Sequence, residues 1–182
     1  MKDNAIIKRY GYALFDIYKE ESKIDRIKDL FDNFIDTLNK NRELYNLFNS
    51  PVISKIEKLN LLKELMNIMN NVDKYFFNFL NLLVMNNRFK YIFSIYDFII
   101  ALYNEVNNKA VATLYVTDKP ESTILEQLKR ELEELIHYTV IFDIKIKKEI
   151  IGGFIIIIKN MFIDASIKKT LNELVLNIKG EI

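Results

Sequence analysis

Apolar residues recur every three to four positions through the first 106 residues of this chain, a pattern that predicts amphipathic helices. Pro51 ends the third of these segments, and Ser22 is expected to cap the second. Ser54 and Glu57 form a capping-box pattern that starts the fourth, and Asn70-Asn71 is expected to end it. The predicted helices are 4–21, 23–39, 41–48, 55–69, 72–86 and 88–106. Six helices with short connections predict an antiparallel bundle.

The pattern changes after Lys109, where stretches of strand character alternate with two helices. The run from Ile155 to Ile158 has no polar position, so we expect a central strand over 150–159 that is buried on both faces. It is too short to cross a bilayer, which takes about 20 apolar residues. The other predicted elements are strands at 110–116, 139–147 and 161–163, and helices at 121–137 and 166–179. This order indicates a small α+β domain.

The predicted fold class is therefore mainly α: an N-terminal six-helix bundle over residues 1–106, followed by a small α+β C-terminal domain over residues 107–182. One helix has more apolar surface than a single core needs, because only Asn78 and Asn81 are strongly polar between residues 75 and 85. One interpretation is a central helix surrounded by the other five. The other is a helix that packs the bundle with one side and forms a groove for a partner helix with the other.

Charge and composition narrow the classes of function. The 182 residues carry 26 basic and 25 acidic side chains, so no net field attracts nucleic acid or an anionic membrane. Cysteine is absent, which excludes disulfides, thiolate chemistry and cysteine-based metal sites. The first residues lead directly into an amphipathic helix without the apolar core of a signal peptide, so we expect a soluble, cytosolic chain.

Candidate chemistry is sparse. His137 is the only histidine and has no second ligand of its kind, so we interpret it as a residue at a helix C-terminus. Asp143, Glu149 and Asp164 could be combined into an acid–base set, but each lies beside a lysine or a turn. The double glycine at 152–153 lacks a phosphate-loop pattern and indicates a bend or a close backbone approach. We expect no catalytic, cofactor or metal site.

Four motifs, the last of them in two segments, lie in order along the chain and resemble those of one family, the delta subunit of F-type ATP synthase. The mitochondrial counterpart of this family is the oligomycin-sensitivity-conferring protein. Arg9–Phe15 resembles the family's opening R-Y-A-x-A-L-F, and Phe48–Lys58 resembles its N/S-P-x-I, E-K segment. Phe79–Arg88 resembles F-L-x-L-L-x-x-N-x-R. The last pair, Ile150–Phe154 and Ile163–Ser166, resembles L-I-G-G-F and I-D-G-S, with Ala165 in place of the usual glycine.

The resemblance implies a non-catalytic stator subunit, peripheral to the cytoplasmic face of a bacterial membrane and attached to it only through the complex. It implies that the helical domain binds the N-terminal helix of an alpha subunit between its first and fifth helices. The C-terminal domain would bind the C-terminus of a b subunit. The residues we expect to form this groove and the packing beneath it are Tyr10, Ala13, Leu14, Ile17, Phe76, Phe79, Leu80 and Leu83. The structural signature implied by the resemblance is Gly152, Gly153, Asp164 and Ser166.

Two other classes of function remain open at this point. A helical RNA-binding or transcription-regulating factor would need a basic stripe, which the sequence lacks. A small-molecule enzyme would need a polar pocket, and no pattern predicts one.

Overall fold

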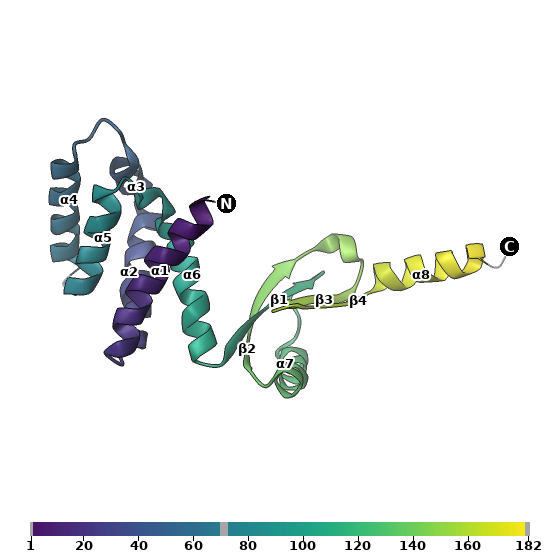
Figure 1. Cartoon of the computed structure of the whole chain (residues 1–182). Coiled ribbons are helices and arrows are strands. Elements are labelled where there is room, and N and C mark those ends of the chain that lie inside the picture. The colour runs from purple at the N-terminus through teal and green to yellow at the C-terminus, as the bar shows by residue number, and fades with distance from the viewer. Residues whose placement is uncertain (1, 70–72, 181–182) are drawn as a thin grey trace. The chain divides into compact units, whose positions relative to one another are not determined.

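A computed structural model describes residues 2–69 and 73–180 of the chain. The chain divides into two compact units, Met1–Tyr103 and Asn104–Ile182; the boundary expected from the sequence lies between residues 106 and 107. The described residues are mainly helical and include one small four-stranded sheet (Figure 1). Among the described helices, none is long and apolar enough to span a membrane.

The described residues of the first unit are mainly helical. Its elements are α1 (Lys2–Glu20), α2 (Ile24–Lys40), α3 (Arg42–Asn49), α4 (Lys55–Ile68), α5 (Lys74–Met85), the single 3-10 turn η1 (Phe89–Tyr91) and α6 (Ile92–Val106). The segment expected as one helix over 88–106 is therefore split, because its first turn is η1. The break expected at Asn70-Asn71 lies outside the described residues.

Local hydrogen bonds set the start of α4, whereas α2 begins without a side-chain cap. The capping box at α4 is present: the Ser54 hydroxyl accepts from the Glu57 amide at 3.3 Å, and the Glu57 carboxylate accepts from the Ser54 amide at 2.8 Å. The expected cap at Ser22 is wrong. Ser22 adopts a left-handed conformation (φ 55°) in the tight turn after α1, and Lys23 precedes α2 without a side-chain cap. An N-cap residue normally has an extended backbone, which Ser22 cannot adopt in this tight turn.

The core of the first unit combines aliphatic side chains with a series of aromatic rings from several helices. The Phe76 ring of α5 packs edge-on against Phe31 and Phe34 of α2, with centroids 4.9 and 5.7 Å apart. Tyrosine hydroxyls at the edge of this core donate to carboxylates on α2: Tyr96 to Asp32 and Tyr103 to Asp25, both at 2.7 Å. Burial and the bond to Asp32 raise the pKa of Tyr96, which keeps its hydroxyl a donor.

The second unit is a four-stranded sheet with two helices. Its elements are β1 (Lys109–Val116), α7 (Ser122–Ile136), β2 (Thr139–Ile146), the 3-10 turn η2 (Lys148–Ile150), β3 (Gly153–Ile158), β4 (Met161–Ser166) and α8 (Ile167–Gly180). The strand order is β2-β1-β3-β4. β1 and β2 are parallel, joined by the α7 crossover, and the other two pairs are antiparallel.

The isoleucine strand is central but not buried on both faces, so that part of the prediction is wrong. Ile156 is 0% exposed, whereas the neighbouring Ile157 is 41% exposed. Ile156 belongs to the core that includes Leu132 of α7, and Figure 1 shows α7 on one side of the sheet. The opposite face, which we call the open sheet face, carries exposed apolar side chains. They are Val111, Ile141, Ile157 and Phe162.

The double glycine marks the start of β3 rather than its middle. Gly153 has φ +74°, and a Cβ there would lie 2.1 Å from the backbone oxygen of Ala165 on β4. A side chain is therefore excluded by both conformation and space. Strand β4 extends to Ser166, beyond the expected 161–163. There the Ser166 hydroxyl accepts from the Lys169 amide at 3.2 Å and caps α8.

Candidate functional site

An open groove runs between α1 and α5. The two helices lie antiparallel: Tyr18, late in α1, contacts Tyr75 at the start of α5, while Tyr10 contacts Phe79 further along (centroids 6.3 and 6.4 Å). The groove has a volume of about 370 Å³. Its lining is largely apolar and consists of Arg9, Tyr10, Ala13, Leu14, Ile17, Tyr75, Asn78, Phe79 and Leu82.

The groove has a buried floor and an exposed rim. Leu14 and Phe79 form the floor and are only 2% and 6% exposed, because they also pack the core. On the rim, Tyr75 is 41% and Leu82 54% exposed. Helix α5 is thus not enclosed by the other helices, and the interpretation of its apolar circumference as a fully surrounded central helix is wrong. Apolar surface remains on this side after the first unit has folded.

Five of the eight residues expected at this site line the groove: Tyr10, Ala13, Leu14, Ile17 and Phe79. The other three, Phe76, Leu80 and Leu83, are fully buried in the core beneath it. Sequence reasoning missed four lining residues, namely Arg9, Tyr75, Asn78 and Leu82. A signal for three of them existed, since positions 75, 78, 79 and 82 follow helical spacing and share one face.

One end of the groove is fixed by the carboxylate of Asp73. It accepts a hydrogen bond from the buried Tyr18 hydroxyl at 2.6 Å and pairs with the Arg26 guanidinium at 2.9 Å. It also caps α5 by accepting from the Tyr75 and Phe76 amides at 3.0 and 3.3 Å. Burial alone would raise the pKa of Asp73, but these donors outweigh it and hold the pKa below its ordinary value.

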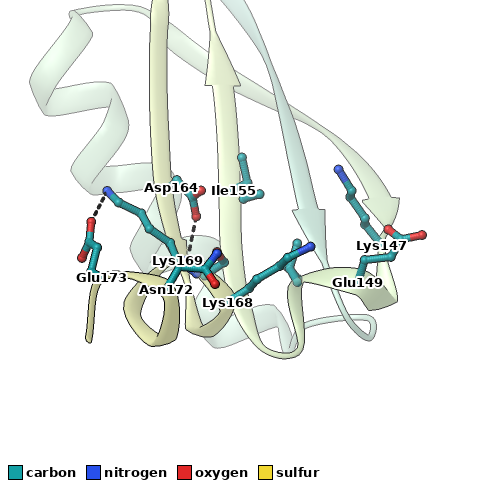
Figure 2. Close-up of a pocket in the computed structure, with 10 residues that line it drawn as sticks. Lys147, Glu149, Ile155, Asp164, Lys168, Lys169, Asn172 and Glu173 are labelled. Atoms are coloured by element: carbon teal, nitrogen blue, oxygen red, sulfur yellow. Dashed lines mark hydrogen bonds and ion pairs between the residues drawn. The ribbon is translucent and has the colours of Figure 1, made fainter. Parts of the chain in front are cut away.

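A second hollow lies in the other unit, at the junction of β4 and α8. Figure 2 shows Asp164 and the Lys169–Glu173 ion pair on one side of it, and Lys147 and Glu149 on the other. Asp164 accepts from the Ser166 amide at 2.9 Å, and its hydrogen bonds to Ser166 lower its pKa. A general acid needs the opposite shift, so Asp164 behaves as a turn-forming carboxylate.

The remaining candidates for chemistry lie apart from this hollow. Asp143 pairs with its neighbour Lys145 at 3.2 Å on β2. His137 ends α7 in the left-handed conformation (φ 56°), and its amide donates to the Glu133 carbonyl at 2.9 Å. His137 lies at a helix C-terminus, as expected from its position in the sequence.

Comparison with known proteins accounts for nearly the whole chain. A family model described as ATP synthase delta (OSCP) subunit matches residues 6–178. The chain belongs to this family. Among its relatives, the ATP synthase subunit delta of Wigglesworthia glossinidia brevipalpis is 36% identical over 162 residues, or 89% of each chain. That of Clostridium beijerinckii is 29% identical over 168 residues, or 92% of each chain.

The fold comparison agrees with this assignment. A chain in the cryo-EM structure of the Toxoplasma gondii mitochondrial ATP synthase hexamer superposes with a TM-score of 0.75, covering 94% of this chain and 96% of that one. At 21% identity this shows a shared fold. As a member of the delta (OSCP) family, the chain is a non-catalytic stator subunit of an F-type ATP synthase. This assignment takes the place of the RNA-binding and enzymatic alternatives.

Proposed function

We propose that the chain joins two parts of the ATP synthase through two separate surfaces. The first unit acts as a six-helix bundle that holds the N-terminal helix of an alpha subunit in the groove between α1 and α5. The second unit holds the C-terminus of a b subunit of the peripheral stalk. The chain would then sit on the cytoplasmic face of a bacterial membrane and be attached to it only through the complex. The observation that carries the proposal is the apolar groove left open after folding.

Apolar contact suits a joint that must resist torque. Burial of apolar surface stabilises an interface by about 25 cal/mol per Å² and does not weaken as ionic strength rises. An exposed ion pair contributes only about 0–1 kcal/mol and is screened by salt. The exposed rim side chains Tyr75 and Leu82 stand beside the buried floor of the groove. This arrangement suits the apolar face of an amphipathic helix.

The open sheet face supports the second contact. Its four apolar side chains, Val111, Ile141, Ile157 and Phe162, are exposed on the side of the sheet away from the α7-facing core. Ile167 and Leu171, in the first turns of α8, are exposed as well. A partner that covers this surface would give β3 the second buried face that its unbroken isoleucine run suggests.

Binding of a synthetic peptide with the N-terminal sequence of the cognate alpha chain tests the first contact. Ala13 lies on the exposed rim, so Ala13→Asp places a charge in the groove without disturbing the core. We expect it to weaken peptide binding at least about tenfold, because the carboxylate would be desolvated without a partner. Asn4→Asp, the same change of charge elsewhere on α1, is the matched control and should bind normally. Unchanged binding by a folded Ala13→Asp variant would defeat the proposal.

The second contact is tested by Ile157→Asp, with a peptide from the C-terminal end of the cognate b chain as the probe. This variant should lose the b peptide while keeping the alpha peptide, since the two surfaces belong to different units. Ala13→Asp should show the reverse. If Ile157→Asp binds the b peptide as well as the wild type does, the open sheet face is not where the peripheral stalk binds.

A further inference from the structure

The end of the groove beside Tyr10 carries a group of hydrogen-bond donors. The guanidinium carbons of Arg9 and Arg88 lie 5.7 and 5.3 Å from the centroid of the Tyr10 ring. Arg88 also donates to the Tyr10 hydroxyl oxygen at 2.8 Å, and the Asn86 side-chain amide donates to it at 3.2 Å. The tyrosine ring therefore holds two cations at the mouth of an apolar groove.

These donors have no acidic partner within the part of the chain that the structure describes. No described carboxylate lies within 4 Å of either guanidinium, and the Tyr10 hydroxyl accepts two bonds without donating to a described acceptor. At the opposite end of the groove, the charges are already paired, because Asp73 forms an ion pair with Arg26 at 2.9 Å. The groove is thus electrostatically polarised along its length, with its unpaired positive charge at the Tyr10 end.

We propose that Arg9 and Arg88, presented on Tyr10, bind a carboxylate side chain of the helix that occupies the groove and so set its direction. This inference rests on the proposed function of the groove and names the chemistry of its occupant. Apolar contacts along two antiparallel helices favour neither direction of a third helix strongly. A guanidinium–carboxylate pair does, because it is directional and forms at one end only. The occupant is an amphipathic helix with an Asp or Glu beside Tyr10.

The same geometry disfavours the reversed helix. Reversal would carry the acidic side chain toward the Asp73 carboxylate, whose hydrogen-bonding capacity is already used by Tyr18, Arg26 and the amides at the start of α5. Like charges brought together in a partly desolvated site are unfavourable. The two ends therefore act together, one by attraction and the other by repulsion.

A double-mutant cycle on the full chain tests the pairing. The probe is a synthetic peptide of the N-terminal helix of the cognate alpha chain, in which each Asp is replaced in turn by Asn and each Glu by Gln. Arg9→Gln is the main variant because Arg9 is exposed, and Lys19→Gln on α1 is the control with the same loss of charge. We expect Arg9→Gln to weaken binding about tenfold and to lower its salt dependence. Lys19→Gln should have little effect.

One acidic residue of the peptide should show the coupling. Its replacement by the amide should weaken binding to the wild type at least as much as Arg9→Gln does, because Arg88 also loses its partner. The two changes together should weaken binding by less than the product of their separate effects. If every acidic replacement combines with Arg9→Gln additively, the inference is wrong and the two arginines only hold Tyr10 in place. A wild-type chain that fails to bind the unmodified peptide would overturn the proposed function as well, so the two failures are distinguishable.

Discussion

Asp73 is the residue whose replacement should reveal most about how the groove is held open. Its carboxylate joins three helices: it accepts from Tyr18 of α1, pairs with Arg26 of α2 and caps the first turn of α5. Its side chain is 11% exposed, so these contacts are made largely out of water. Asp73→Ala removes all of them and inserts no new group.

The expected loss can be built from the separate contacts. Removal of an N-cap lowers stability by about 1 kcal/mol. The Tyr18 hydroxyl would stay buried without a partner, which costs about 1–3 kcal/mol. The ion pair adds less than about 1 kcal/mol, because the Arg26 side chain is half exposed. We therefore expect Asp73→Ala to lower the free energy of unfolding of the first unit by about 3 kcal/mol.

Residue-resolved hydrogen exchange is the suitable measurement, since it separates the two units of one chain. Amides of α1 and α5 should lose protection in Asp73→Ala, whereas those of β1 and β3 serve as the internal control. Tyr18→Phe should cost less, because it removes the donor without leaving it buried and unpaired. The double variant should then be more stable than the sum of the single effects implies. A loss below about 0.5 kcal/mol for Asp73→Ala, or strict additivity with Tyr18→Phe, would refute this account of the contact.

Three further predictions concern the same chain. Because the pKa of Asp73 is lowered from an ordinary value of 3.8, the stability it adds is full above that value and is lost as the pH falls through the folded-state pKa. The advantage of the wild type over Asp73→Asn in urea unfolding should therefore shrink from pH 7 toward pH 3, and a constant advantage would contradict it. Ile156→Ala should lower the free energy of unfolding of the second unit by about 2–5 kcal/mol and Ile157→Ala by less than about 1 kcal/mol, since only the first side chain is fully buried; equal losses in denaturant titration would argue against the one-sided sheet. Gly153→Ala should lower stability by more than the roughly 1–2 kcal/mol of a left-handed alanine, because its Cβ would also meet the Ala165 oxygen at 2.1 Å. Unchanged hydrogen-exchange protection of β3 and β4 would contradict the close approach of Gly153 to Ala165.

Features that depend on residues close in sequence were predictable. The capping box of Ser54 and Glu57 needs four consecutive residues and the geometry of one helical turn, so the sequence pattern alone identified it. The order of helices and strands also followed from periodicity, because the period is a property of each segment by itself. The predicted cap at Ser22 was wrong because it depends on more than the neighbouring sequence. The turn that brings α1 back to α2 decides its backbone conformation.

Features that depend on which other elements lie nearby were not predictable. Ile156 and Ile157 are the same residue type in the same strand, and only the position of α7 makes one buried and the other exposed. Leu80 and Leu82 of α5 differ in the same way, one in the core and one on the rim of the groove. Arg88 reaches Tyr10 across 78 positions of sequence, and no local pattern indicates that contact.

The open sheet face affects how readily the unassembled protein aggregates. Strands β2 and β4 are the two edges of the sheet, and the exposed Ile157 and Phe162 side chains lie at or beside the β4 edge. In a copy without its partners, an edge strand lies beside exposed apolar side chains, a combination that promotes aggregation between identical chains. If the peripheral stalk binds this face as proposed, synthesis together with the stalk subunits would shorten that exposure, and surplus copies would be substrates for chaperones and proteases.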